Sequence, residues 1–254
     1  MRLSPLAGSV VCLLLSWPAF LAGEPVAVRV AERAANTPLV LRSLSGTALA
    51  TGESIQTVRA GQVTSRVVFR FTDGSLHDET CVFSQNDVFR LLSYRLSQKG
   101  PSFRWALDMT IDTQTGRVVV RHADRAGEEE VEDEKLDLAS DVANGMMVTV
   151  LKNLGARAQA TASFVAATPE PRPVKLAISS AGSEPVSLAG SSGRAAHYVI
   201  KAEIGGLAGV LAPLVGRQPP DTHVWILEGA SPSFVKSEGP LFYGGPIWRI
   251  ELAR

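Results

Sequence analysis

The sequence predicts a β-rich fold, a curved antiparallel sheet or incomplete barrel with one amphipathic helix against its concave side. Three observations predict it. Apolar residues alternate with polar ones along several segments, short turn signals separate these segments, and one segment has clear helical periodicity. Segments joined by such short turns favour antiparallel pairing. Because the sequence offers too few helices to cover the apolar strand faces, the sheet must curl or close on itself.

The clearest predicted strand covers residues 103–111. Its large apolar residues lie two positions apart, and they are Phe103, Trp105, Leu107, Met109 and Ile111. On a strand this spacing places all five side chains on one face, with mostly polar side chains on the other. The same alternation is present at 67–71, 198–202 and 248–252. The dipeptide Asp73-Gly74 between two such segments predicts a hairpin.

Residues 140–154 predict an amphipathic helix. The apolar residues that follow the helical period are Val142, Met146, Met147, Val150, Leu151 and Leu154. Ser140 or Asp137 is expected to cap the start of the helix, and Gly155 is expected to end it. Since Gly145 costs about 1 kcal/mol relative to Ala inside a helix, we expect the helix to depend on packing against the sheet.

Residues 1–23 have the features of a secretory signal peptide. Arg2 precedes an uncharged apolar run at 6–21, and the small residues Ala22 and Gly23 end it. Prolines and a glycine interrupt this run, and a membrane span needs about 20 consecutive apolar residues. Removal of the leader is therefore favoured over its retention as a membrane anchor. We expect a periplasmic or secreted mature chain without a transmembrane span.

The mature chain is expected to begin with an N-terminal arm or edge strand at residues 24–43. Residues 44–254 are expected to form a single β-rich domain. A proline-rich connector at 168–173 divides the strands of this domain into two sets, because alternating prolines exclude regular strand pairing. One cysteine, Cys81, lies after the leader, so no internal disulfide is expected.

The charge balance of the mature chain argues against a nucleic-acid partner. The full sequence has 25 basic and 25 acidic residues, and only Arg2 of these lies in the leader, so 24 basic and 25 acidic residues follow it. A net charge near −1 gives no electrostatic reason to bind nucleic acid or an anionic membrane surface.

The segment 77–81 is the sharpest candidate for chemistry. On a strand, His77, Glu79 and Cys81 project from one face, and imidazole, carboxylate and thiolate are all zinc ligands. A cysteine near a histidine is also a potential nucleophile. The competing interpretation is a structural strand, because no second pair of closely spaced ligands is present. A metal site would need His122 or His223 to converge on the same point.

The remaining polar motifs predict no cofactor. The acidic run at 128–134 lacks the spacing of a calcium loop, and a solvated loop or edge strand is favoured. His122, His197 and His223 are isolated in the sequence and are expected to have structural or surface roles. Neither a dinucleotide-binding motif nor a phosphate-binding loop is present.

The order of these features resembles that of uncharacterised exported bacterial families. The exported start, the strand meander, the segment 140–147 leading into 151–154, and the return to strands carry the resemblance, which covers residues 44–254. Those families are domains of unknown function with a lipocalin-like or half-barrel β-sheet, and they imply no catalytic residues. The predicted shape is also similar to that of periplasmic lipoprotein carriers, in which helices close a half-barrel over an apolar cavity.

These features predict an exported, non-enzymatic protein that binds an apolar small molecule, a lipid or another cell-envelope component. The residues expected to line its binding cup are Phe103, Trp105, Leu107, Met109 and Met146. Concave apolar pockets bind apolar ligands, and a filled core is the competing interpretation of the same residues. The alternative functions are a metal-assisted hydrolase that uses His77, Glu79 and Cys81, and a structural role with an envelope protein as partner.

Overall fold

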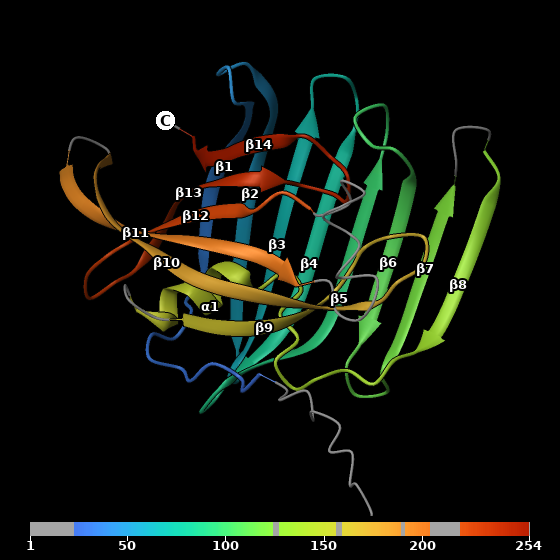
Figure 1. Ribbon diagram of the computed structural model, residues 1–254, viewed down its shortest axis with the longest axis horizontal. Helices are drawn as coiled ribbons and strands as arrows, with labels where there is room; N and C mark the ends of the chain where they lie inside the picture. The colour runs from blue at the N-terminus through green and yellow to red at the C-terminus, as the bar shows by residue number, and fades with distance from the viewer. Residues whose placement is uncertain (1–22, 124–126, 156–158, 189–190, 204–218, 254) are drawn as a thin grey trace, which may run out of the picture.

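The structure is a computed structural model that describes residues 23–123, 127–155, 159–188, 191–203 and 219–253. Within these ranges, fourteen strands form a single sheet and α1 (Met147–Leu154) is the one helix (Figure 1). The predicted β-rich class, with a helix against the concave side of a curved sheet, is confirmed. The predicted signal peptide, apart from Gly23, lies outside the described residues.

Most of the strands follow one another with short connections, whereas the segments between β8 and β9 and between β11 and β12 are longer. They are β1 (Ala35–Ser43), β2 (Ala48–Arg59), β3 (Gln62–Phe71), β4 (Leu76–Gln85), β5 (Phe89–Lys99), β6 (Ala106–Asp112), β7 (Arg117–Ala123), β8 (Glu129–Lys135), β9 (Gln159–Val165), β10 (Pro173–Leu188), β11 (Ser191–Glu203), β12 (Thr222–Leu227), β13 (Ser233–Pro240) and β14 (Ile247–Leu252). All ladders between neighbouring strands are antiparallel, as the short turns predict.

Two meanders make up the sheet, and the pairing of β1 with β14 joins them. The order of the strands is β8 to β1 in descending order, followed by β14 to β9 in descending order. Residues 24–43 are expected to form an N-terminal arm or an edge strand. The second half of this segment is not an edge strand, because β1 lies inside the sheet with β2 on one side and β14 on the other. In the register of the junction, Leu41 faces Ile250. These two residues are far apart in sequence, so no local pattern reveals the pairing.

The two halves of the sheet face each other. Strands β9 to β13 run across the front of β2 to β6 in Figure 1, and α1 lies between the two layers. The edge strands β8 and β9 do not pair with each other, so the sheet is curled but not closed. Edge strand β8 carries most of the predicted acidic run, and its charged side chains discourage pairing with another chain.

The predicted strand at 103–111 is shorter than expected. Side chains alternate between buried and exposed only from Ala106 to Asp112. Before it, Gly100 has a φ of 105° and the Phe103 amide donates to the Gly100 carbonyl oxygen at 3.1 Å, which makes a turn. Trp105 lies outside β6 and is half-buried, with the Arg104 guanidinium 4.6 Å above its ring.

The predicted helix at 140–154 begins seven residues later than expected. Val142 forms a parallel bridge with Ser163 of β9, so the backbone there bonds to the sheet. Gly145 has a φ of 72°, which an α-helix cannot contain, and a Cβ there would lie 2.9 Å from the Cβ of Cys81. Tertiary contacts therefore override the helical periodicity of 140–146, and Gly155 ends the helix as predicted.

Asn144 covers part of the outer edge of β9. Its side chain is fully buried, and the amide accepts from the Val165 N–H and donates to the Val165 carbonyl oxygen, both at 2.9 Å. These bonds satisfy two backbone groups that a neighbouring strand would otherwise satisfy. The proline-rich connector at 168–173 then joins β9 to β10. It does not divide the two sets of strands, because that division falls at α1.

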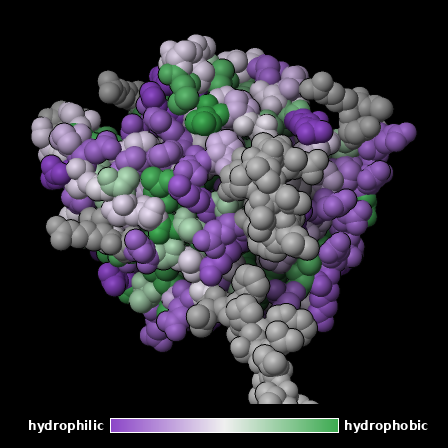
Figure 2. Space-filling view, viewed as in Figure 1, coloured by the Kyte–Doolittle hydropathy of each residue, from purple (hydrophilic) through white to green (hydrophobic). Residues whose placement is uncertain are grey.

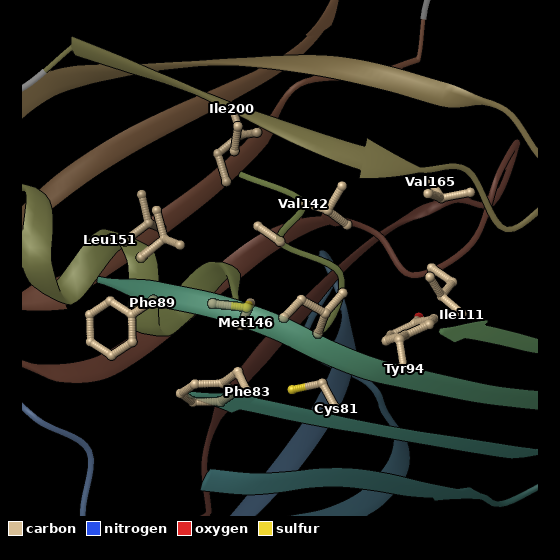
Figure 3. Packing of buried hydrophobic residues seen from close by; sticks show 14 of the residues in the cluster. Cys81, Phe83, Phe89, Tyr94, Ile111, Val142, Met146, Leu151, Val165 and Ile200 are labelled. Carbon is tan, nitrogen blue, oxygen red and sulfur yellow. The ribbon is translucent and has the colours of Figure 1, made fainter. Parts of the chain in front are cut away.

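The main core fills the space between the two layers. It contains buried residues from both halves of the sheet, such as Phe83 and Ile200, together with Met146 and Leu151 from the helical segment. Figure 3 shows these side chains facing one another across the interior. The described residues therefore occupy the concave side with packed side chains, as the filled-core interpretation expects.

The bonds of Asn144 make its removal costly. We expect Asn144→Ala to lower the free energy of unfolding by about 2–4 kcal/mol, because it leaves a buried N–H and a buried C=O without partners. Urea denaturation measures this loss. The matched control is Asn36→Ala on β1, where the side chain is exposed, and there we expect a change below about 0.5 kcal/mol. Equal effects of the two substitutions would contradict the role of Asn144.

Substitutions at Trp105 and Met109 compare the stability cost of removing a half-buried and a fully buried side chain. Met109 is fully buried in the main core, and Met109→Ala is expected to cost about 2–5 kcal/mol. Trp105→Ala is expected to cost only about 1 kcal/mol, because the ring is half-buried outside the sheet. Urea midpoints of both variants test this order. If Trp105→Ala lowered the free energy of unfolding as much as Met109→Ala, the Trp105 ring would have to be packed in the core.

Candidate functional site

The predicted polar residues of β4 share its inward face, but each has a different partner. The Gln98 side-chain amide donates to His77 Nδ1 at 3.1 Å, and the Tyr94 hydroxyl donates to Glu79 Oε1 at 2.8 Å. The Cys81 thiol donates to the Gly145 carbonyl oxygen at 3.3 Å. The side chains therefore belong to three separate contacts along the strand.

Burial shifts the pKa values of the polar side chains on the inward face of β4. Desolvation raises the pKa of Glu79, and the hydrogen bond from Tyr94 opposes this shift. Desolvation also raises the pKa of the Cys81 thiol far above its usual range, with a further contribution from Glu79. The raised pKa favours the neutral thiol, which is a weaker nucleophile than the thiolate.

Within the described ranges, no group of three His, Cys, Asp or Glu side chains lies close enough to hold a metal ion. The two histidines considered as further ligands lie elsewhere. His122 is on β7, where its Nε2 is 3.4 Å from Glu130 Oε2, and His223 is on the convex face of β12. Metal ligation by His77, Glu79 and Cys81 stays a prediction that elemental analysis of the purified protein can test.

The residues expected to line a binding cup divide between two clusters. Leu107, Met109 and Met146 lie in the main core, each at most 3% exposed. Phe103 belongs to a second cluster at one end of the molecule, and Trp105 lies in the loop that leads away from it. The predicted set therefore does not form one wall.

This second cluster is rich in aromatic rings. Phe71, Phe103, Phe242 and Trp248 form a cycle in which consecutive ring centroids lie 5.2–5.8 Å apart. Such spacing with tilted or edge-on rings is favourable for aromatic pairs. The rings come from β3, from the turn before β6, and from the hairpin of β13 and β14. Sequence reasoning found Phe71, Phe103 and Trp248 as strand residues but not their association.

Three exposed apolar side chains border this cluster. Leu44 is 51% exposed, Tyr243 is 40% exposed and Ile247 is 38% exposed. Leu44 follows Ser43, which pairs with Trp248, and Ile247 precedes Trp248, so both residues lie at the same end of the β1–β14 ladder as Trp248. We call these three residues and the four rings the aromatic end. Figure 2 shows hydrophobic side chains on the upper part of the molecule, where Figure 1 places the β1–β2 turn.

The loops of the aromatic end are fixed by polar contacts. The Ser102 hydroxyl donates to Asp73 Oδ2 at 2.7 Å, and the Ser75 amide donates to Asp73 Oδ1 at 2.9 Å. These bonds lower the pKa of Asp73, with the Ser102 hydroxyl as the main cause. The Ser102 amide in turn donates to Ser75 Oγ at 2.9 Å. The turn of β3 and β4 and the loop before β6 thus hold each other in place.

Two histidines that are isolated in the sequence meet on the convex face. His197 Nε2 and His223 Nδ1 lie 2.9 Å apart, and His197 Nδ1 is 3.2 Å from Glu184 Oε1. The His197 ring stacks on Trp225 at 4.2 Å, and burial lowers the pKa of His197. Lys236 covers the Trp225 ring at 3.9 Å. These histidines are isolated in the sequence, and the register of β11 and β12, in which His197 faces Trp225, brings them together.

A groove lined by both polar and apolar side chains crosses the convex face of β4 to β7. It has a volume of about 310 Å³, and its lining includes Thr80, Ser93, Arg95, Thr110 and Arg117. Arg117 Nε also donates to Asp133 Oδ1 of β8 at 2.9 Å. Val82, Ile111 and Val119 also line this groove, and none of the residues predicted to bind the apolar ligand lies in it.

None of the described helices is long and apolar enough to cross a membrane.

His77 makes stability depend on pH. Burial lowers its pKa to about 4 in the folded state, below the value of about 6.5 expected when unfolded. As the pH falls below 6.5, the unfolded chain binds the proton first, so stability present at neutral pH is lost down to about pH 4. The loss reaches about 3 kcal/mol.

Urea midpoints at pH 7, 5.5 and 4.5 measure this loss. His77→Gln removes the titrating group but keeps a polar side chain beside Gln98, so its midpoints should fall less steeply than those of the wild type. The difference between the two proteins isolates His77 from the carboxylates. Parallel pH profiles would show that His77 titrates normally.

Comparisons with known proteins give no family assignment. No protein-family model matches the sequence, and no curated protein matches it. Among solved structures, this chain matches a beta-barrel-like protein of a domain of unknown function, DUF1849, from Brucella abortus. The sequences are 13% identical, the match covers 92% of this chain and 98% of that chain, and the TM-score is 0.47. A likeness of this degree identifies a structural neighbour and assigns no function.

Proposed function

We propose that the protein is exported and binds an apolar component of the cell envelope, without catalysis, through the aromatic end. One observation carries this proposal. Five large hydrophobic side chains are exposed among the described residues, and three of them, Leu44, Tyr243 and Ile247, border the aromatic end. The other two, Val131 and Val148, lie apart on β8 and α1. Such a concentration of exposed apolar side chains is typical of an interaction site.

The chemistry of this end favours an apolar partner. A tyrosine at its border combines a large apolar ring with a hydroxyl that can stay in water, a combination common where an apolar surface meets a polar one. The net charge of the mature chain is near zero, so long-range attraction contributes little. Burial of the exposed side chains then provides the free energy of binding, at about 25 cal/mol per Å².

The position of the site supports binding at the surface of the sheet. The concave side is filled by packed residues such as Met109 and Met146, so it leaves no open cup among the described residues. The four rings instead pack against one another into an ordered support at the end of the β1–β14 ladder where Leu44 and Ile247 lie. A support that is already ordered lowers the entropy cost of binding.

Export is supported by the leader sequence. Residues 1–23 carry the charge and hydropathy pattern of a signal peptide. The one cysteine after the leader, Cys81, is buried and free, so the fold needs no disulfide chemistry in either compartment. We place the mature protein in the periplasm or outside the cell.

Substitution of the exposed side chains tests the proposal. We expect Tyr243→Ser combined with Ile247→Ser to weaken binding to phospholipid vesicles about tenfold, since it removes apolar area worth roughly 1–2 kcal/mol. Co-sedimentation with vesicles of phosphatidylethanolamine and phosphatidylglycerol measures the binding. Because both side chains are about 40% exposed, the urea midpoint should change little.

Val131→Ser is the matched control. Val131 is 54% exposed on β8, away from the aromatic end, and its replacement should leave vesicle binding unchanged. Equal losses in the control and the double variant would indicate non-specific adhesion. Absence of binding by the wild-type protein would overturn the proposed lipid partner.

A further inference from the structure

Asp141 is a buried residue with one carboxylate oxygen that has no hydrogen-bond partner within the described residues. It is 8% exposed, and its Oδ1 atom makes no hydrogen bond. It lies beside a cavity of only about 10 Å³, whose lining includes Pro25, Phe89 and Met146. None of the ion pairs within the described ranges includes Asp141. A carboxylate in such a mainly apolar setting is costly unless a cation or several donors satisfy it.

Gly23 lies directly against this carboxylate. A Cβ atom added to Gly23 would collide with Asp141 Oδ2 and would lie 2.9 Å from Thr161 Oγ1. By covalent geometry, the nitrogen atoms of Gly23 and Glu24 both lie within about 2.5 Å of the Gly23 Cα atom. A cut on either side of Gly23 would therefore leave the new amino group next to Asp141.

The chain after Gly23 is already held in place. The Val26 carbonyl oxygen accepts from the Phe89 amide at 2.9 Å, and the Arg29 amide donates to Asn153 Oδ1 at 2.9 Å. Glu32 accepts from the Thr149 hydroxyl at 2.7 Å. Because residues 26–32 are fixed by these bonds, little conformational freedom is lost when the terminus itself is held.

We propose that Asp141 binds the α-ammonium group of the processed N-terminus. A signal peptidase of the envelope would hydrolyse the peptide bond before Gly23 or before Glu24. Water adds across the C–N bond, the leader leaves with a new carboxylate, and the mature chain gains an α-amino group that is protonated at neutral pH. This ammonium has three N–H donors for Asp141 and Thr161 and supplies the missing positive charge. The proposal rests on the proposed export.

The first test identifies the terminus. The full chain with its leader is expressed in a bacterium, and N-terminal sequencing and intact mass are measured on the mature protein. A terminus at Gly23 or Glu24 is expected. A terminus more than two residues from Gly23 overturns the inference while leaving export intact, whereas an intact leader overturns export as well.

The second test measures the energetic coupling between the positive charge of the processed N-terminus and the Asp141 side chain. Asp141→Asn is compared with the wild type in two forms, one with the processed terminus and one with Gly-Ser-Gly-Ser added before it. We expect Asp141→Asn to lower the melting temperature of the processed form by about 4 °C and to have a much smaller effect in the extended form. Equal effects in the two forms overturn the inference.

A third readout reports on the amino group itself. With Asp141 present, acylation of the α-amino group at pH 7 should be about tenfold slower than in Asp141→Asn, because the ion pair holds the proton. Asp137→Asn is the matched control, since Asp137 is exposed in the same segment, and it should change neither the rate nor the melting temperature. Unchanged acylation in Asp141→Asn would contradict the ion pair even if the protein were less stable.

Discussion

The pairing of β1 with β14 is the constraint on which the rest of the structure depends. It joins two meanders that are each local in sequence, and it sets the register in which Leu41 faces Ile250. The apolar faces of the two halves then meet across the interior, and the main core forms between them. Without this junction, each half would be an open sheet with one apolar face exposed to water.

The same junction creates the aromatic end. Trp248 of β14 lies beside Ser43 of β1, so the start of β14 and the turn after β1 share one end of the molecule. Phe71 approaches Trp248 from β3, and Phe242 approaches it from the loop between β13 and β14. The core and the candidate site are thus two results of one pairing. Two of its rings belong to strands and two to loops, and the packing of all four against one another orders the site.

The interior is filled, and its polar groups are mostly satisfied. His77, Glu79 and Cys81 each contact a neighbour that the fold supplies, and Asn144 completes the edge of β9. The candidate chemistry of β4 was visible in the sequence because the rule of alternation places these residues on one face. Their partners were not visible, since Gly145 and Tyr94 reach them through tertiary packing. For the same reason the pair of His197 and His223 appeared isolated.

The sequence by itself determined several of the strands, their antiparallel pairing through short turns and the end of the helix at Gly155, because alternation and turn residues act over a few neighbouring positions. Only the tertiary structure decided where β6 and α1 begin, since the turn at Gly100 and the bonds of residues 142–144 to β9 compete with local periodicity. The tertiary structure also decided that β1 lies inside the sheet and not at its edge. Pairing between distant strands depends on which apolar faces can be buried together, and that is a property of the whole chain.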